Sequence, residues 1–322
     1  MRLGNCFSGL KTALLILIVS SVVVLLLSSG NPRSITQAAV IIPGPATAAC
    51  LSGEESLEIK EEATIECSLE SNGDIEIKER AMVFGEVVSA DGNLELKEGA
   101  NIEGNLLIGR KVELKEHSLV RGDVTSGGEV ELKENARVEG DVTSGGRVKL
   151  HPTAMVTGTI TQFAVLPPIP PIAPLSFSFG AGGSDVVIAH GGYLALPPGS
   201  YGRLTSKAES TLLLSSGEYF FTKFELGERS FFNFDLSGGP IAVSVTLEFG
   251  LKELTTMTII SAVGEPADLT FQVKGETTLK EDGQYLGVFQ ALEESELKED
   301  ATLLGSLRGK KVKVKERSRV AF

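Results

Sequence analysis

The side chains that could do chemistry are few in this sequence, and they are spread along it. The histidines His117, His151 and His190 lie far apart, and no HExxH or CxxC motif indicates zinc or redox chemistry. The sequence also has no GxSxG motif, no glycine-rich phosphate loop and no Ser/His/Asp arrangement. We therefore expect no cofactor, no metal and no enzymatic activity.

Two aspartates come closest to an acidic site. Asp123 and Asp141 each follow a glycine, and they occupy the same place in successive copies of the repeat described below. Two carboxylates stacked by a repeat could hold calcium, or could serve as acid and base as in polysaccharide-active enzymes. No set of basic side chains gathers around them from one copy to the next, so we expect solvent-facing corners. An enzyme acting on polysaccharide is the least favoured function.

Two of the three cysteines could form a disulfide if the protein is exported. Cys50 and Cys67 are separated by close to one unit of the same repeat. A separation of one unit would place their Cα atoms ~5 Å apart, within disulfide range. Cys6 lies before the apolar N-terminal run and cannot join this pair.

A short tandem repeat must position these side chains. Copies of one apolar–Glu–apolar–Lys–Glu segment begin at Leu57, Ile75, Leu94, Val112 and Val130, at a nearly constant step. Within a copy, three i, i+2 pairs of apolar or small residues are offset by six, as the inward faces of three short strands would be. A glycine follows the second pair, where a corner must turn. Helices are excluded by the strict alternation and by a glycine in every unit. The fold class predicted is all-β: a three-sided parallel β-helix, or solenoid, with ~18 residues per turn.

The chain divides into segments that differ in how regularly the repeat recurs. Residues 55–162 form the regular array, and residues 163–175 are a proline-rich linker that must be extended. Residues 176–276 are expected to form degenerate turns that hold most of the phenylalanines, and residues 277–322 return to the regular pattern. Whether the linker separates two solenoids or loops out of one stays open.

Two charged ladders should stack on one outer face of the array. Their members are Glu76, Glu95, Glu113 and Glu131, with Lys78, Lys97, Lys115 and Lys133 two residues further along. Exposed ion pairs are worth ~0–1 kcal/mol each, so the ladders should act mainly in solubility and register. Docking of a charged polymer is the less favoured interpretation.

The N-terminus is expected to be an export or anchoring helix. Arg2 and Lys11 precede an apolar run, Thr12–Leu27, which is slightly short of the ~20 residues that span a bilayer. The basic residues keep the N-terminus cytoplasmic and direct the rest outward. Residues 1–30 are thus a signal or anchor segment, and residues 31–54 a linker and N-terminal cap. Whether the segment is cleaved stays open; if it is not, the membrane is a partner through Thr12–Leu27.

The first array is built from x-[AS]-x-[IV]-x-G-x-[VLI] units such as Ala136-Arg137-Val138-Glu139-Gly140-Asp141-Val142. In these units it resembles the bactofilins, a bacterial family of polymer-forming cytoskeletal proteins. The resemblance covers residues 55–162 and again about 277–322, whereas the middle segment looks more like secreted bacterial β-solenoid surface proteins. The family implies a right-handed β-helix that assembles end to end without a nucleotide.

Composition and repeat together favour a structural protein. The 322 residues carry a net charge of −12, which argues against nucleic acid because that partner requires a basic surface. We expect an extracytoplasmic scaffold, in the periplasm or at the cell surface, whose main partner is itself. The self-assembly end is expected at the last strand, with Val320 and Phe322. The alternative is a secreted or cell-surface solenoid that binds cell-wall or extracellular polysaccharide.

Overall fold

The computed structural model describes residues 18–19, 22–23 and 49–322, which fall into two units, Met1–Ala46 and Thr47–Phe322. In the first unit, β1 (Ile18–Val19) pairs antiparallel with β2 (Val22–Val23). Most of the predicted helix, Thr12–Leu27, lies outside the described residues, and the four of its residues that are described form these strands. They give no support to a helix there. Within the described ranges, no helix has the length and apolarity needed to cross a membrane.

The second unit is a parallel β-solenoid with three faces, so the predicted fold class is confirmed for this part of the chain. Each face is a sheet of thirteen strands, given below in spatial order.

Face A carries the predicted charged ladders. Its strands are β21 (Val186–Ile188), β24 (Arg203–Ser206), β27 (Lys223–Leu226), β30 (Phe249–Leu251), β33 (Thr277–Leu279), β35 (Glu294–Leu297), β36 (Thr302–Val314), β3 (Leu51–Ile59), β6 (Asp74–Ile77), β9 (Leu94–Leu96), β12 (Val112–Leu114), β15 (Val130–Leu132) and β18 (Val148–Leu150).

Face B follows face A along the chain. Its strands are β22 (Tyr193–Leu196), β25 (Thr211–Ser215), β28 (Phe231–Asp235), β31 (Thr256–Ile259), β34 (Gln284–Ala291), β36, β37 (Arg319–Ala321), β4 (Thr64–Ile65), β7 (Met82–Val83), β10 (Asn101–Ile102), β13 (Leu119–Val120), β16 (Arg137–Val138) and β19 (Met155–Val156).

Face C completes each turn of the solenoid, or rung. Its strands are β23 (Gly199–Ser200), β26 (Gly217–Phe221), β29 (Ile241–Val245), β32 (Leu269–Val273), β34, β36, β3, β5 (Leu69–Ser71), β8 (Val87–Ser89), β11 (Leu106–Ile108), β14 (Val124–Ser126), β17 (Val142–Ser144) and β20 (Ile160–Thr161). The long strands β3, β34 and β36 bend across more than one face, and a short 3₁₀ helix, η1 (Pro266–Asp268), precedes β32.

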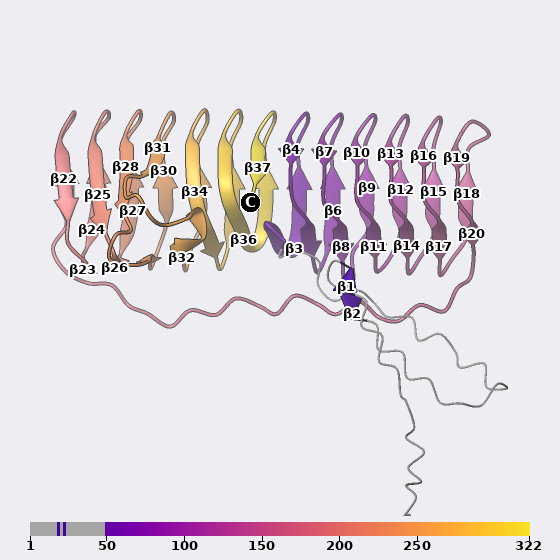
Figure 1. Ribbon diagram of the computed structural model, residues 1–322, viewed down its shortest axis with the longest axis horizontal. Coiled ribbons are helices and arrows are strands. Elements are labelled where there is room, and N and C mark those ends of the chain that lie inside the picture. The colour runs from indigo at the N-terminus through magenta and orange to yellow at the C-terminus, as the bar shows by residue number, and fades with distance from the viewer. Residues whose placement is uncertain (1–17, 20–21, 24–48) are drawn as a thin grey trace, which may run out of the picture. The chain divides into compact units, whose positions relative to one another are not determined.

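The spatial order of the rungs is not their order in the chain. Of the solenoid strands, β3 comes first in the chain and lies in the middle of the solenoid, and the chain winds outward from it to β20 at one end (Figure 1). It then returns along the whole length and starts again at β21, at the opposite end (Figure 1). From there it winds inward until β36 and β37 stack on β3 and β4. The structure thus contains one solenoid with a permuted order of rungs, which answers the question left open for the linker.

The width of the rungs differs between the two halves. From Leu57 to Val148 on face A, paired residues are 18 or 19 positions apart, as the repeat predicts. In the second half the step grows to 20 from Leu204 to Phe224, to 25 from there to Phe249, and to 28 from there to Thr277. The wider rungs enclose the buried phenylalanines, whereas the narrow ones are filled by Leu, Ile, Val, Ala and Ser.

The corner from face A to face B has the same conformation in both halves. A residue with positive φ follows each Lys-Glu pair, for example Glu62 (φ 60°), Arg80 (φ 58°) and Asp300 (φ 55°). A small buried residue comes next, such as Ala63 or Ala81. Because a bulky residue at the small position would meet the neighbouring rungs, this corner keeps the stacking uniform while rung width changes elsewhere.

The returning segment, residues 163–182, is an extended strap across the rungs. Over its proline-rich part every third residue is half-buried against the solenoid, at Leu166, Ile169, Ile172 and Leu175, and the prolines between them are exposed. A period of three is that of polyproline II, which rises 3.1 Å per residue, so about 20 residues reach ~62 Å. Twelve rung spacings of ~4.8 Å require ~58 Å, so only an extended strap is long enough.

Side-chain contacts hold the strap at three places. Asn72 donates to the carbonyl of Ile172 (3.0 Å) and accepts from its N–H (2.6 Å). Near the strap's far end the Lys274 ammonium lies 4.8 Å from the ring centre of Phe179, and that ring packs 6.4 Å from Phe220. Between these points the backbone N–H of Leu175 donates to a carboxylate of β3.

Candidate self-association surfaces

One end of the solenoid exposes the interior of its last rung. Leu150 of β18 and Ile160 of β20 continue rows of core residues, yet they are 43% and 38% exposed. Their partners in the preceding rung, Leu132 and Val142, are 1% and 0% exposed. The difference arises because no described residue stacks on the outer side of β18, β19 and β20. This end therefore combines free strand edges with an uncovered apolar core.

The opposite end is covered more completely by its own side chains. Ile188 of β21 and Leu196 of β22 are buried, although they belong to the first rung of that half. The Tyr201 ring stacks on Phe221 with centroids 5.4 Å apart, and its hydroxyl donates to the Pro197 carbonyl (2.6 Å). Strands β21–β23 also have one edge without a partner in the described part of the chain. The two ends thus differ in apolar exposure and not in strand pairing.

The prediction of an open edge at Val320 and Phe322 is wrong. Val320 is fully buried and pairs with Ile65, so β37 lies between β36 and β4. Phe322 is exposed, but it lies beside an edge that β4 already occupies. The prediction assumed that the last rung in the chain is also the last rung in space. That assumption fails because the strap returns the chain to the opposite end of the solenoid, from which the rungs wind back to the middle.

The predicted charged ladders lie on the outer surface of face A. Each lysine bonds the glutamate of its own rung and also reaches the glutamate of the preceding rung: Lys115 is 2.5 Å from Glu113 and 3.2 Å from Glu95. Lys97 likewise contacts Glu95 (2.8 Å) and Glu76 (3.2 Å). The same positions hold Lys78 (2.5 Å from Glu76) and Lys133 (2.5 Å from Glu131). The two ladders therefore neutralise each other.

The same two columns continue beyond the four rungs of the predicted ladders. Within the first array Lys60 pairs with Glu58 (2.5 Å). In the C-terminal rungs Glu296 lies between Lys298 (2.8 Å) and Lys315 (3.2 Å). The recurrence of Leu-Lys-Glu near the C-terminus was the signal in the sequence for this continuation. Within the ladders the largest pKa shift is at Glu131, where hydrogen bonds from Lys133 and Lys111 lower the pKa of the carboxyl to about 2.

Cys50 and Cys67 are joined by a disulfide in the structure, with Cα atoms 5.9 Å apart. Cys50 immediately precedes β3, and its N–H donates to the Ser68 carbonyl (3.2 Å). The bond thus fastens the first rung of the chain to the second.

The two aspartates considered as an acidic site have a structural role. Asp123 accepts the backbone N–H of Asp141 (2.8 Å), and Asp141 accepts that of Thr159 (2.6 Å). Each carboxylate caps the next rung at the corner before face C. Among the described residues no group of three or more His, Cys, Asp or Glu side chains could hold a metal ion.

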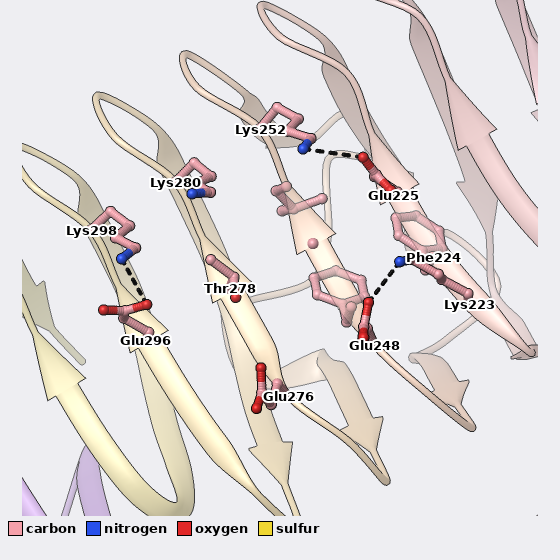
Figure 2. Close-up of a pocket in the computed structure, with 13 residues that line it drawn as sticks. Lys223, Phe224, Glu225, Glu248, Lys252, Glu276, Thr278, Lys280, Glu296 and Lys298 are labelled. Carbon is pink, nitrogen blue, oxygen red and sulfur yellow. Dashed lines mark hydrogen bonds and ion pairs between the residues drawn. The ribbon is translucent and has the colours of Figure 1, made fainter.

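A depression of about 340 Å³ lies on face A over the wide rungs (Figure 2). It exists because Gly250 has no side chain between Glu225 and Thr278. Its rim consists of ion pairs, Lys223 with Glu248 (2.6 Å) and Lys252 with Glu225 (3.1 Å).

Aromatic rings do not line this depression in a way that would favour sugars. Phe224 and Phe249 lie beneath it and are almost fully buried, so neither presents a face to a ligand. Of the neighbouring phenylalanines Phe231 and Phe232 on face B, Phe232 is buried and Phe231 is half exposed.

Comparison with known proteins gives one family and one solved structure. Residues 51–161 match the model of the family described as "Bactofilin: Polymer-forming cytoskeletal", which confirms the resemblance for the first array. No curated protein matches the chain. A crystal structure of an ice binding protein from an Antarctic bacterium, Flavobacteriaceae, is similar at 9% identity and a TM-score of 0.31, covering 86% of this chain and 82% of that one. At that score the likeness carries no argument about this protein.

Proposed function

We propose that this protein is a non-enzymatic structural scaffold whose solenoids stack end to end. The match of residues 51–161 to a polymer-forming cytoskeletal family supports the proposal. The observation that carries it is the exposed core at β18–β20, where Leu150 and Ile160 lie open. Free strand edges beside apolar surface are a template for pairing with another chain.

Stacking is geometrically simple because both halves advance along the axis in the same direction. If β18–β20 of one copy meet β21–β23 of the next, all strands stay parallel and the three faces continue. Leu150 and Ile160 would then be covered as Leu132 and Val142 are within one copy. Covering a Leu or Ile side chain stabilises by about 1.5–3 kcal/mol, so several at one contact would support association.

We also propose that the solenoid lies outside the cytoplasm. The disulfide between Cys50 and Cys67 supports this location, because such bonds persist in oxidising compartments. Arg2 and Lys11 before the apolar run Thr12–Leu27 support an exported body, attached to the membrane if the run is retained.

Electron microscopy of the full chain tests the assembly. Wild-type protein is expected to form filaments, and a Leu150→Lys, Ile160→Lys variant no end-to-end filaments, because charges at the contact must lose their hydration. Leu304→Lys is the matched control, since Leu304 is similarly exposed but lies in mid-solenoid on face B; filaments should persist. Monodisperse single solenoids of the wild type at high concentration would refute end-to-end stacking.

A further inference from the structure

The solenoid contains one internal junction at which the two stacked rungs are not consecutive in the chain. We call it the seam: the contact of β36 and β37 with β3 and β4. Residues paired there, such as Leu307 with Leu51 and Arg319 with Thr64, are 255 or 256 positions apart. The seam has the hydrogen bonds of an ordinary rung contact, including Leu307 N–H to the Cys50 carbonyl (2.7 Å). It is nevertheless held by noncovalent contacts alone.

The two rungs that meet at the seam carry opposite charges. Residues 51–66, the acidic rung, contain six glutamates and one lysine. Residues 307–322, the basic rung, contain seven lysines and arginines and one glutamate. In a chain whose net charge is −12, a basic segment this dense stands apart from the balanced ladders elsewhere. The charge pattern therefore favours contact between these two rungs.

The opposite charges face each other across the junction. Arg319 forms two hydrogen bonds with Glu66, at 2.8 and 3.0 Å. Lys310 lies 3.5 Å from Glu55, and Lys313 is the register partner of Glu58. Complementary charge of this kind selects a partner and its register more than it adds affinity.

The strap ties the far ends of the two halves together and leaves the seam free of any covalent link. It also crosses the seam, where Glu54 accepts the Leu175 N–H and Arg308 donates to the Ala173 carbonyl. Within one copy these contacts with the strap therefore help to hold the seam closed. The disulfide fastens the acidic rung to the rung behind it, so this rung keeps a neighbour when the basic rung leaves.

We propose that the seam is an exchangeable joint, at which the acidic rung of one copy docks on the basic rung of a second copy. Every copy carries both surfaces, so the contact is heterologous and can continue from copy to copy. When the seam opens, the strap lifts and links the two halves of its chain as a tether. This joint uses neither Leu150 nor Ile160 and does not depend on the end-to-end stacking proposed above.

A charge-reversal experiment on the full chain separates the two contacts. All variants carry Leu150→Lys and Ile160→Lys, so the open end cannot contribute. One further carries Glu55→Lys, Glu58→Lys and Glu66→Arg, and the other Lys310→Glu, Lys313→Glu and Arg319→Glu. Glu54 and Arg308 are left unchanged because they also hold the strap.

Each reversed variant alone has like charges on both sides of its seam, whereas a mixture offers two complementary seams between copies. We expect native mass spectrometry to show hetero-dimers in the 1:1 mixture and none for either variant alone. A chain with all six reversals should close on itself and stay monomeric. A mixture that gives no hetero-dimer while the six-fold variant is folded would overturn the proposal.

An engineered disulfide across the seam, here called the lock, tests the exchange even if the reversed variants do not fold. Ser56 and Lys311 are register partners on face A, so Ser56→Cys with Lys311→Cys in a Cys6→Ser background should form a disulfide across the seam. Isotopically light and heavy copies, with their open ends blocked as above, should form mixed dimers at high concentration when the lock is reduced and none when it is oxidised. Mixed dimers at the same level in both states, or in neither, would refute exchange through the seam.

Discussion

The narrow rungs from β3 to β20 and the wide rungs from β24 to β33 fill their interiors with different kinds of side chain. Narrow rungs are filled by aliphatic and small residues in steps of 18 or 19. In the wide rungs the step is longer by as many as ten residues, and phenylalanine fills the extra space. The corner between faces A and B is common to both. Rung width therefore follows core volume, while the shared corner maintains the stacking.

Aromatic contacts run along the axis in the wide half and have no counterpart in the narrow half. Phe271 stacks on Phe289 with centroids 4.4 Å apart and meets Phe249 at 5.2 Å. Phe249 in turn lies 4.9 Å from Phe224. Pairs in this geometry contribute ~0.5–1.5 kcal/mol beyond the area they bury. Removing one ring should therefore affect several rungs.

The largest effect is expected from Phe271→Ala. Phe271 is fully buried and contacts rings of neighbouring rungs, so its truncation should lower the free energy of unfolding by about 3–5 kcal/mol. Phe231→Ala is the matched control in the same half, since that side chain is half exposed, and it should change stability by less than ~0.5 kcal/mol. Urea unfolding followed by circular dichroism measures both. Equal losses for the two would show that ring packing does not set the wide rungs.

Two glycines, one in each half, differ in the space around them. At Gly104, a corner of the narrow half, an added Cβ would lie 2.3 Å from the carbonyl oxygen of Gly85 in the preceding rung. Gly104→Ala should therefore destabilise by ~1–3 kcal/mol, as overpacking does. At Gly250, in a wide rung, nothing lies within 4 Å, and alanine should stabilise by ~0.4–1 kcal/mol through the unfolded chain. Calorimetry should show melting temperatures moving in opposite directions; a shift in the same direction would contradict the steric account.

The inward faces and the narrow rungs could be predicted from the sequence because they depend only on local spacing. Leu94, Leu96 and Ile102 are buried where the i, i+2 pattern places them. Rung order could not be predicted in this way, since a repeat shows which residues face inward but not which rung stacks on which. One clue to that order is the opposite charge of residues 51–66 and 307–322, which are remote in the chain and stack in the structure.

The greater width of the rungs in the second half could not be predicted from the sequence for a different reason. The similar motifs around Tyr201 and Tyr219 are separated by the same step as the copies of the first array, which suggests a constant rung width. The extra residues lie between strands, so the strands keep their pattern while their spacing grows. In the structure, Tyr219 pairs with Gly199 and not with Tyr201, because Tyr201 has left the strand.

The smallest effect concerns acid, and it is expected at the charged ladder of the narrow half. Hydrogen bonds from Lys133 and Lys111 lower the pKa of Glu131 to about 2 from its ordinary value near 4.5. A carboxyl whose pKa is lower in the folded state stabilises the protein above its unfolded pKa, and this contribution is lost as pH falls from about 4.5 to about 2. In the wide half the ladder is interrupted, because Gly250 and Thr278 occupy the corresponding positions between Glu225 and Glu296.

Glu131→Gln should therefore lower the melting temperature at pH 7 and have little effect near pH 2. The loss at pH 7 should be at most ~1 kcal/mol, because the ion pairs are partly exposed to solvent. Thr278→Val is the control on the same face, and its effect should not depend on pH. Thermal unfolding at both pH values measures the difference. A Glu131→Gln effect of equal size at both would mean that the side chain acts through packing, and that the charged ladder does not distinguish the two halves.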